Sequence, residues 1–280
     1  MEDKRSALSK KIYDFIQSKP IWFCIVYILL FAILGYKVFS VVVLKDIGSG
    51  CNWATGFLKF SLSLLSIVFI KEIYGGKYNF YFQKKGLWQS ILLGWIAWIY
   101  IISNMIGEDY SGSLNWKILF SVFMCNFFTG LFEEVTMRGV ILQHMVYKFS
   151  KKKNGVVKAI FWSSFLFGII HLGNLLAGNY FATFMQVLYA IAIGMIFGTI
   201  FLLTKNIWGV VILHWLVDAS SHFYLAITYA NEETITPLLV LNPYYKLIFL
   251  TVFSYVVAIF LLRKKNRQKI CELWSIKESE

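Results

Sequence analysis

The chain has 280 residues, of which 58% are hydrophobic and 15% are charged, and its formal net charge is +12. Its mean hydropathy of +0.64 and its repeated apolar runs of about 20 residues exclude a soluble globular protein, because a bilayer core of about 30 Å is what requires runs of that length. The positive charge does not indicate nucleic-acid binding, because the lysines and arginines cluster at the ends of alternate apolar runs. We therefore predict an all-α, polytopic integral membrane helix bundle.

The apolar runs predict about eight transmembrane helices, each near the length that crosses a bilayer. The first run has no small-residue cleavage site after it, so we expect it to be retained rather than removed as a signal peptide. The expected helices cover 21–44, 54–72, 87–106, 116–145, 156–176, 181–204, 207–229 and 244–262. The expected regions are a cytoplasmic N-terminal segment at 1–20, N-terminal transmembrane helices at 21–115, core helices at 116–229, a last transmembrane hairpin at 230–262 and a basic cytoplasmic tail at 263–280.

The basic residues also predict the orientation of the bundle. They gather before the first apolar run and after the second, fourth, sixth and eighth, whereas the other connections hold few positive charges. By the positive-inside rule, both termini are expected in the cytoplasm.

The four cysteines, Cys24, Cys51, Cys125 and Cys271, have no spacing typical of a metal site. They also fall in dissimilar positions along the chain. We therefore expect neither a disulfide framework nor a cysteine-based zinc site.

Three charged residues interrupt the interior of the apolar run at 116–145, namely Glu133, Glu134 and Arg138. A charged side chain near the bilayer centre costs about 3 kcal/mol even on the most lenient scale, so these groups need partners or a purpose. Glu134 and Arg138 are four residues apart, which places them on one helix face and predicts an ion pair. Glu133 lies about 100° round the helix and has no such local partner. It is therefore the carboxylate that we expect to titrate, accept a proton or hold a metal.

Later runs add further ionisable groups at membrane depth. His171 follows Phe167 by one helical turn, and His214, Asp218 and His222 recur at a spacing of four residues. Unrelated buried polar groups on three helices would each carry a desolvation cost, so we expect them to converge on one cavity. Counting inward from the cytoplasmic helix ends at about 1.5 Å per residue predicts that this cavity opens towards the cytoplasm.

These residues form three motifs in order, EExxxR, FxxxH and HxxxD, each on its own predicted helix. In this respect residues 116–229 resemble the CAAX protease and bacteriocin-processing family, also called Abi, of intramembrane proteases. The resemblance implies peptide-bond hydrolysis within the membrane and makes 116–229 the catalytic core. It implies that Glu133 is the general base that activates water and that His171 helps to position it. It further implies that His214 and the residue four later stabilise the oxyanion, while Glu134 and Arg138 hold the architecture.

Asp218 departs from the family pattern, in which an asparagine often occupies this position. An ionised aspartate accepts hydrogen bonds and would repel an oxyanion, so Asp218 is protonated, orients His214 or helps to bind a metal. The imidazole and carboxylate ligands that zinc accepts are offered by Glu133, His171, His214 and Asp218. The HExxH arrangement of common zinc proteases is absent. We favour metal-independent activation of water and leave zinc as an open alternative.

The main functional hypothesis is a multi-pass endopeptidase of a bacterial cell membrane that cleaves a small peptide or a lipid-modified protein. The resemblance implies roles in bacteriocin maturation, self-immunity or peptide-pheromone processing. A second hypothesis is a non-catalytic member of the family that binds and regulates a membrane partner such as a sensor kinase. A third, a transporter with a proton relay, predicts inverted repeats and broken helices, and the sequence indicates neither.

Overall fold

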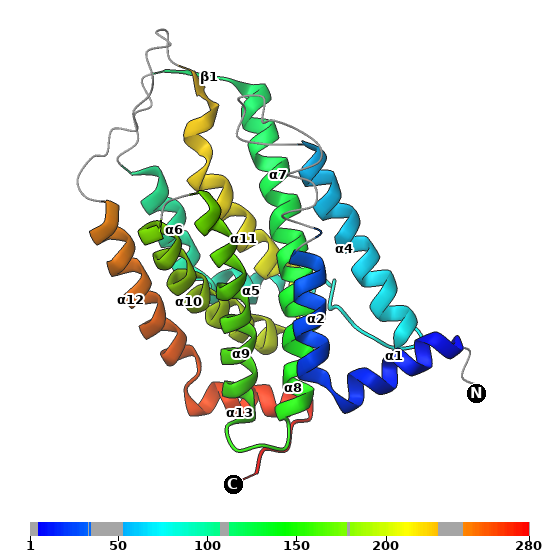
Figure 1. Cartoon of the computed structure of the whole chain (residues 1–280). Coiled ribbons are helices and arrows are strands. Elements are labelled where there is room, and N and C mark those ends of the chain that lie inside the picture. Colours follow the sequence, from blue (N-terminus) through cyan, green and yellow to red (C-terminus); the bar gives the residue numbers. More distant parts are fainter. Residues whose placement is uncertain are drawn as a thin grey trace.

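The computed structural model describes residues 5–32, 34, 53–106, 112–177, 180–228 and 243–279. These residues form a bundle of helices with one pair of two-residue strands, so the predicted all-α membrane fold is confirmed (Figure 1). Among them, four helices are long and apolar enough to cross a membrane alone, and up to seven spans result if each bent helix pair counts as one. The expected number of eight spans is therefore not confirmed.

The N-terminal part of the bundle begins with a bent pair of helices. Helix α1 (Ala7–Ser18) starts where the Ser6 side chain accepts a hydrogen bond from the backbone N–H of Ser9, and it meets α2 (Pro20–Ala32) at an angle of 115°. Most of the remainder of the expected first span, up to residue 44, lies outside the described residues. Helix α4 (Trp53–Ile73) matches the second expected span closely.

The third expected span is not one straight helix. It consists of α5 (Leu87–Leu93) and α6 (Trp95–Met105), which are bent by 60° at Gly94. A side chain at Gly94 would require Leu213 on a neighbouring helix to move, because its Cβ would lie 2.2 Å from Cδ1 of that residue. The sequence indicated no broken helices, and that expectation is wrong for this span.

The core helices match their predicted ranges at most ends. Helix α7 (Trp116–Glu134) continues through a π-helical segment, η2 (Val135–Leu142), into α8 (Gln143–Phe149). The elements that follow are α9 (Gly155–Ile170), the 3-10 helix η3 (His171–Ala177), α10 (Tyr180–Thr204), α11 (Ile207–Ser221) and the 3-10 helix η4 (Phe223–Ala226). Helix α11 ends at Ser221 rather than at the expected residue 229, and after η4 the chain forms β2 (Ile227–Thr228), which pairs antiparallel with β1 (Ser113–Leu114).

The C-terminal part holds α12 (Pro243–Leu261) and α13 (Lys264–Trp274), which are bent by 62°. The predicted basic tail therefore contains a helix. It is tied to the bundle where the indole Nε1 of Trp274 donates a hydrogen bond to the Leu202 carbonyl over 2.7 Å.

The two ends of the bundle differ in character. Helices α1, α8 and α13 lie at the end where both termini lie, and the β1–β2 pair lies at the opposite end (Figure 1). Between them, α10 forms much of the core, since Phe197 and Phe201 on it are almost completely buried. We call the end with α8 and α13 the basic end, because Lys148, Lys151–Lys153 and the basic residues of 263–269 are there.

One cysteine differs from its expected state. Cys125 on α7 is disulfide-bonded. Cys24 and Cys271 are free thiols. The expectation that no disulfide forms is therefore wrong for Cys125.

Candidate active site

A pocket of about 770 Å³ lies in the bundle and is bordered by α4, α6, α7, α9, α10, α11 and α12. It contains all four residues that the sequence predicted as catalytic, so the predicted convergence on one cavity is confirmed. Phe167 and His222 also line it, whereas Glu134 and Arg138 do not. The predicted residues that line the pocket are Glu133, Phe167, His171, His214, Asp218 and His222.

The two glutamates lie where α7 changes into the π-helical segment η2 at Val135. Short π-helical stretches inside α-helices often occur at functional sites, because they change which side chains share a face. All residues from Leu131 to Leu142 are buried. The charged groups of this stretch therefore depend on partners within the protein.

Arg138 supplies the partner that the sequence predicted for Glu134. Its Nη1 donates a hydrogen bond to Oε1 of Glu134 over 2.9 Å, and its Nη2 donates to the Gly194 carbonyl over 3.4 Å. The guanidinium also lies over the rings of Phe167, at 5.1 Å, and Phe197, at 5.7 Å. The pair thus ties α7 and η2 to α9 and α10.

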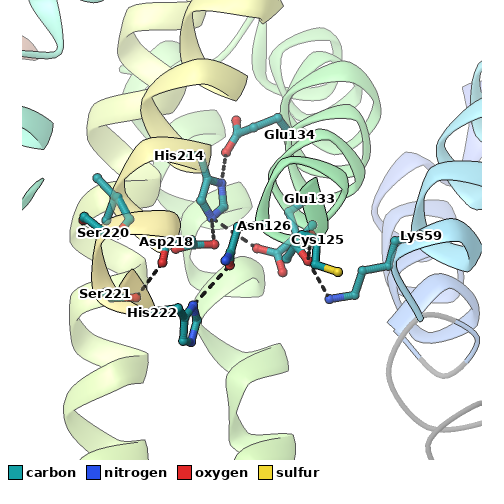
Figure 2. A network of polar contacts seen from close by, with 12 residues as sticks. Lys59, Cys125, Asn126, Glu133, Glu134, His214, Asp218, Ser220, Ser221 and His222 are labelled. Carbon is teal, nitrogen blue, oxygen red and sulfur yellow. Dashed lines mark hydrogen bonds and ion pairs between the residues drawn. The ribbon is translucent and has the colours of Figure 1, made fainter. Parts of the chain in front are cut away.

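His214 is the centre of the polar network (Figure 2). Its Nδ1 donates a hydrogen bond to Oε1 of Glu134 over 2.7 Å, since an ionised carboxylate can only accept. Its Nε2 lies 3.5 Å from Oε2 of Glu133 and 3.4 Å from Oδ2 of Asp218. The Glu134 contact therefore sets the direction of the ring, and Nε2 faces the two carboxylates in the pocket.

Asp218 takes a position that supports one of the three roles considered for it. It lies one turn after His214 on α11 and next to Nε2 of that residue, which is the arrangement expected if it orients the imidazole. His222 follows the end of α11, is exposed, and its Nδ1 donates to Oδ1 of Asn126 over 3.2 Å. The predicted stripe of three polar residues thus ends at the rim of the pocket.

His171 lies at the junction of α9 and η3. Its Nδ1 donates a hydrogen bond to the Phe167 carbonyl over 2.8 Å, and its ring meets the Phe167 ring edge to face at 5.0 Å. Because Nδ1 is used in this way, Nε2 is the nitrogen that can act in the pocket.

The side chains as placed do not form a metal site. No group of three or more histidine, cysteine, aspartate or glutamate residues is arranged to hold a metal ion in the part of the chain that the structure describes, which includes the four zinc-ligand candidates.

Lys59 is a pocket residue that sequence reasoning missed. It lies two turns into α4 with only 9% of its surface exposed, and its Nζ donates a hydrogen bond to Oγ1 of Thr129 over 3.0 Å. Figure 2 shows it on the same side of the network as Glu133. The sequence could have identified Lys59 as a candidate site residue, because it lies inside a predicted span rather than at a span boundary. A lysine inside a span carries a desolvation cost.

The pocket opens at the β1–β2 end of the bundle. Its deep residues, such as Glu133, Phe197 and His214, are buried, whereas its exposed residues lie where α11 ends and α12 begins and on η3. The exposed ones are Asn174, Ser221, His222 and Lys246. The predicted opening towards the end that carries the basic connections is therefore wrong.

Comparison with known proteins agrees with the motifs. Residues 115–220 match the family described as Rce1-like, type II CAAX prenyl endopeptidase Rce1-like. This stretch contains EExxxR, FxxxH and HxxxD, so the resemblance to the CAAX protease and bacteriocin-processing family is confirmed there. No curated protein and no solved structure matches the chain significantly.

Proposed function

Since this chain carries an Rce1-like, type II CAAX prenyl endopeptidase domain over residues 115–220, we propose that it is an intramembrane endopeptidase. Glu133 is the general base of the proposed reaction. The substrate of the proposed endopeptidase is a small peptide or a lipid-modified protein. The observation that carries the proposal is that His214 lies close to Glu133 and Asp218 in the pocket while its other ring nitrogen bonds Glu134, which is outside the pocket lining. Such a set of buried ionisable groups is costly in a membrane protein and is a functional site by default.

In the proposed reaction, Glu133 takes a proton from a water molecule while the water oxygen bonds to the carbonyl carbon of the scissile peptide. The carbonyl π electrons move to oxygen and form a tetrahedral oxyanion. When this intermediate collapses, the C–N bond breaks and the leaving nitrogen takes the proton that Glu133 had accepted. His171, through Nε2, positions the attacking water.

His214 serves the oxyanion in this scheme. As imidazolium it donates from both nitrogens, with Nδ1 held by Glu134 and Nε2 directed into the pocket. A positioned donor of this kind is worth about 3–4 kcal/mol in better-known proteases. Asp218 orients the ring from one turn away and needs no direct contact with the oxyanion.

The test is cleavage of short peptides, prenylated and unprenylated, by the purified full chain in detergent. Glu133→Gln and His171→Ala are each expected to lose activity about a hundredfold or more, because general base catalysis contributes about 10²–10⁴-fold. Glu272→Gln is the control, since Glu272 is an exposed glutamate on α13, outside the pocket. Full cleavage by Glu133→Gln would contradict the mechanism.

A chelator arm of the same experiment addresses zinc. Activity that is unchanged after chelation supports activation of water by Glu133 without a metal. Activity that is lost on chelation and restored by zinc supports the alternative in which Glu133, His171, His214 and Asp218 rearrange around a metal.

The biological roles implied by the resemblance stay predictions, namely bacteriocin maturation, self-immunity or peptide-pheromone processing in a bacterial cell membrane. The non-catalytic alternative, a protein that regulates a partner such as a sensor kinase, predicts a different outcome in cells. A cellular phenotype that Glu133→Gln retains in full would favour that alternative, and a phenotype that it abolishes would favour the endopeptidase.

A further inference from the structure

The mouth of the active-site pocket and the basic connections lie at opposite ends of the bundle. The mouth is formed by exposed residues such as Ser221 at the end of α11 and Lys246 near the start of α12, away from α13 (Figure 1). The connection between α8 and α9, with Lys151–Lys153, lies at the other end with both termini (Figure 1).

The connections near the mouth carry acidic residues, unlike those at the basic end. The sequence between α6 and β1 holds Glu108 and Asp109, and the sequence between β2 and α12 holds Glu232 and Glu233. Neither connection contains a lysine or an arginine. By the positive-inside rule the basic end is cytoplasmic, and the end with the mouth is then on the other side of the membrane.

The disulfide at Cys125 points to the same side independently. Cys125 lines the pocket on the part of α7 between the mouth and Glu133, and it is disulfide-bonded. Disulfides persist in oxidising compartments outside the cytoplasm and are rare inside it. Cys271, on α13 at the basic end, is a free thiol, as expected for the cytoplasmic side.

We infer that the active site takes its substrate from the non-cytoplasmic side of the membrane, as a polar peptide segment of an exported or membrane-anchored chain. This inference rests on the proposed endopeptidase function and names the substrate that the site accepts. The exposed residues at the mouth carry an amide, a hydroxyl, an imidazole and one lysine ammonium, which suit the polar backbone of an extended peptide. A prenylated protein delivered from the cytoplasm would arrive at the opposite end of the bundle.

Cysteine labelling in intact cells tests the side on which the mouth lies. The full chain is expressed with Cys24 and Cys271 replaced by alanine and with one new cysteine, Ser221→Cys at the mouth or Lys152→Cys at the basic end. Both original side chains are exposed, so the two sites are matched. A membrane-impermeant maleimide is expected to label Ser221→Cys in intact cells and Lys152→Cys only after permeabilisation.

Labelling of Lys152→Cys in intact cells overturns the inference, and so does labelling of Ser221→Cys that requires permeabilisation. Asn174→Cys, also exposed at the mouth, replaces Ser221→Cys if that variant does not fold. The labelling needs no hydrolysis, so its result is independent of the outcome of the cleavage assay.

A second measurement connects the mouth to the reaction. Attaching a bulky maleimide to Ser221→Cys in the purified protein is expected to lower peptide cleavage at least tenfold, because it obstructs the entrance. The same label on Lys152→Cys is expected to leave cleavage unchanged. Equal cleavage by both labelled proteins would show that the substrate enters elsewhere and would overturn the inference.

Discussion

Glu134 joins two basic side chains, because its Oε1 accepts hydrogen bonds from both Arg138 and His214. It is completely buried, and so is almost all of Arg138. In the pocket, Glu133 and Asp218 add two more carboxylates around the same imidazole. This arrangement separates the roles of the two adjacent glutamates: Glu134 holds the site together, and Glu133 faces the substrate.

We predict that Glu134→Gln lowers stability more than Glu133→Gln does. The substitution leaves the Arg138 guanidinium as a buried charge without its carboxylate, which costs about 3–5 kcal/mol. Thermal unfolding of the purified protein in detergent measures the difference, with Glu272→Gln on the exposed face of α13 as the matched control. Equal melting temperatures for Glu134→Gln and the control would refute this role.

Lys59 supports a second prediction at this scale. It is a buried basic side chain in the pocket that contains Glu133, and a positive charge there attracts the carboxylate and the negative charge that develops during hydrolysis. Lys59→Met keeps the length of the side chain and removes the charge, and it is expected to lower kcat/KM about tenfold, or about 1.4 kcal/mol. Lys59→Arg retains the charge and should retain more of the activity.

The control for Lys59 lies on the same helix. Lys71 is exposed near the other end of α4, and Lys71→Met should leave kcat/KM unchanged. An equal loss in both lysine variants would assign the effect to the stability of α4 rather than to the pocket.

At the scale of the helices, the close packing of α9 against α10 helps to position His171. A Cβ at Gly168 would lie 2.4 Å from Cγ1 of Ile191 and 2.9 Å from the Val187 carbonyl oxygen. Small residues at helix interfaces allow backbones to approach in this way. Because His171 follows one turn later at the start of η3, the separation of α9 from α10 bears on its position in the pocket.

We therefore predict that Gly168→Ala destabilises the protein by about 1–3 kcal/mol, as overpacking in a core does, and lowers cleavage by displacing His171. Gly173→Ala is the control, because a Cβ at Gly173 would meet no atom within 4 Å. Melting temperature and cleavage rate are measured for both. Wild-type values for Gly168→Ala would show that α9 can shift without consequence for the site.

At the scale of the whole molecule, the basic residues of the connections and the mouth of the pocket lie at opposite ends of the bundle. The basic connections, both termini and α13 share one end, and the mouth of the pocket and the β1–β2 pair share the other (Figure 1). The labelling of Ser221→Cys and Lys152→Cys belongs to this scale, because it tests how the entire bundle is oriented in the membrane. The orientation with both termini in the cytoplasm is a prediction of the sequence that the same labelling tests.

The sequence by itself determined the class of the protein, the approximate positions of most helices and the pairing of Glu134 with Arg138. These features depend on local information: the length of an apolar run matches the bilayer, and a spacing of four residues places two side chains on one helix face. The order of the three motifs also depends on sequence alone, and the Rce1-like match at residues 115–220 agrees with it.

Only the tertiary structure decided that His214 bonds Glu134, that Lys59 lies in the pocket and that the pocket opens away from the basic end. It also decided the break between α5 and α6 and the disulfide at Cys125. Each of these depends on how separate helices pack, and packing is set by shape and volume at contacts such as that of Gly94 with Leu213. Glu134 and His214 are 80 residues apart, so no local spacing could predict their hydrogen bond.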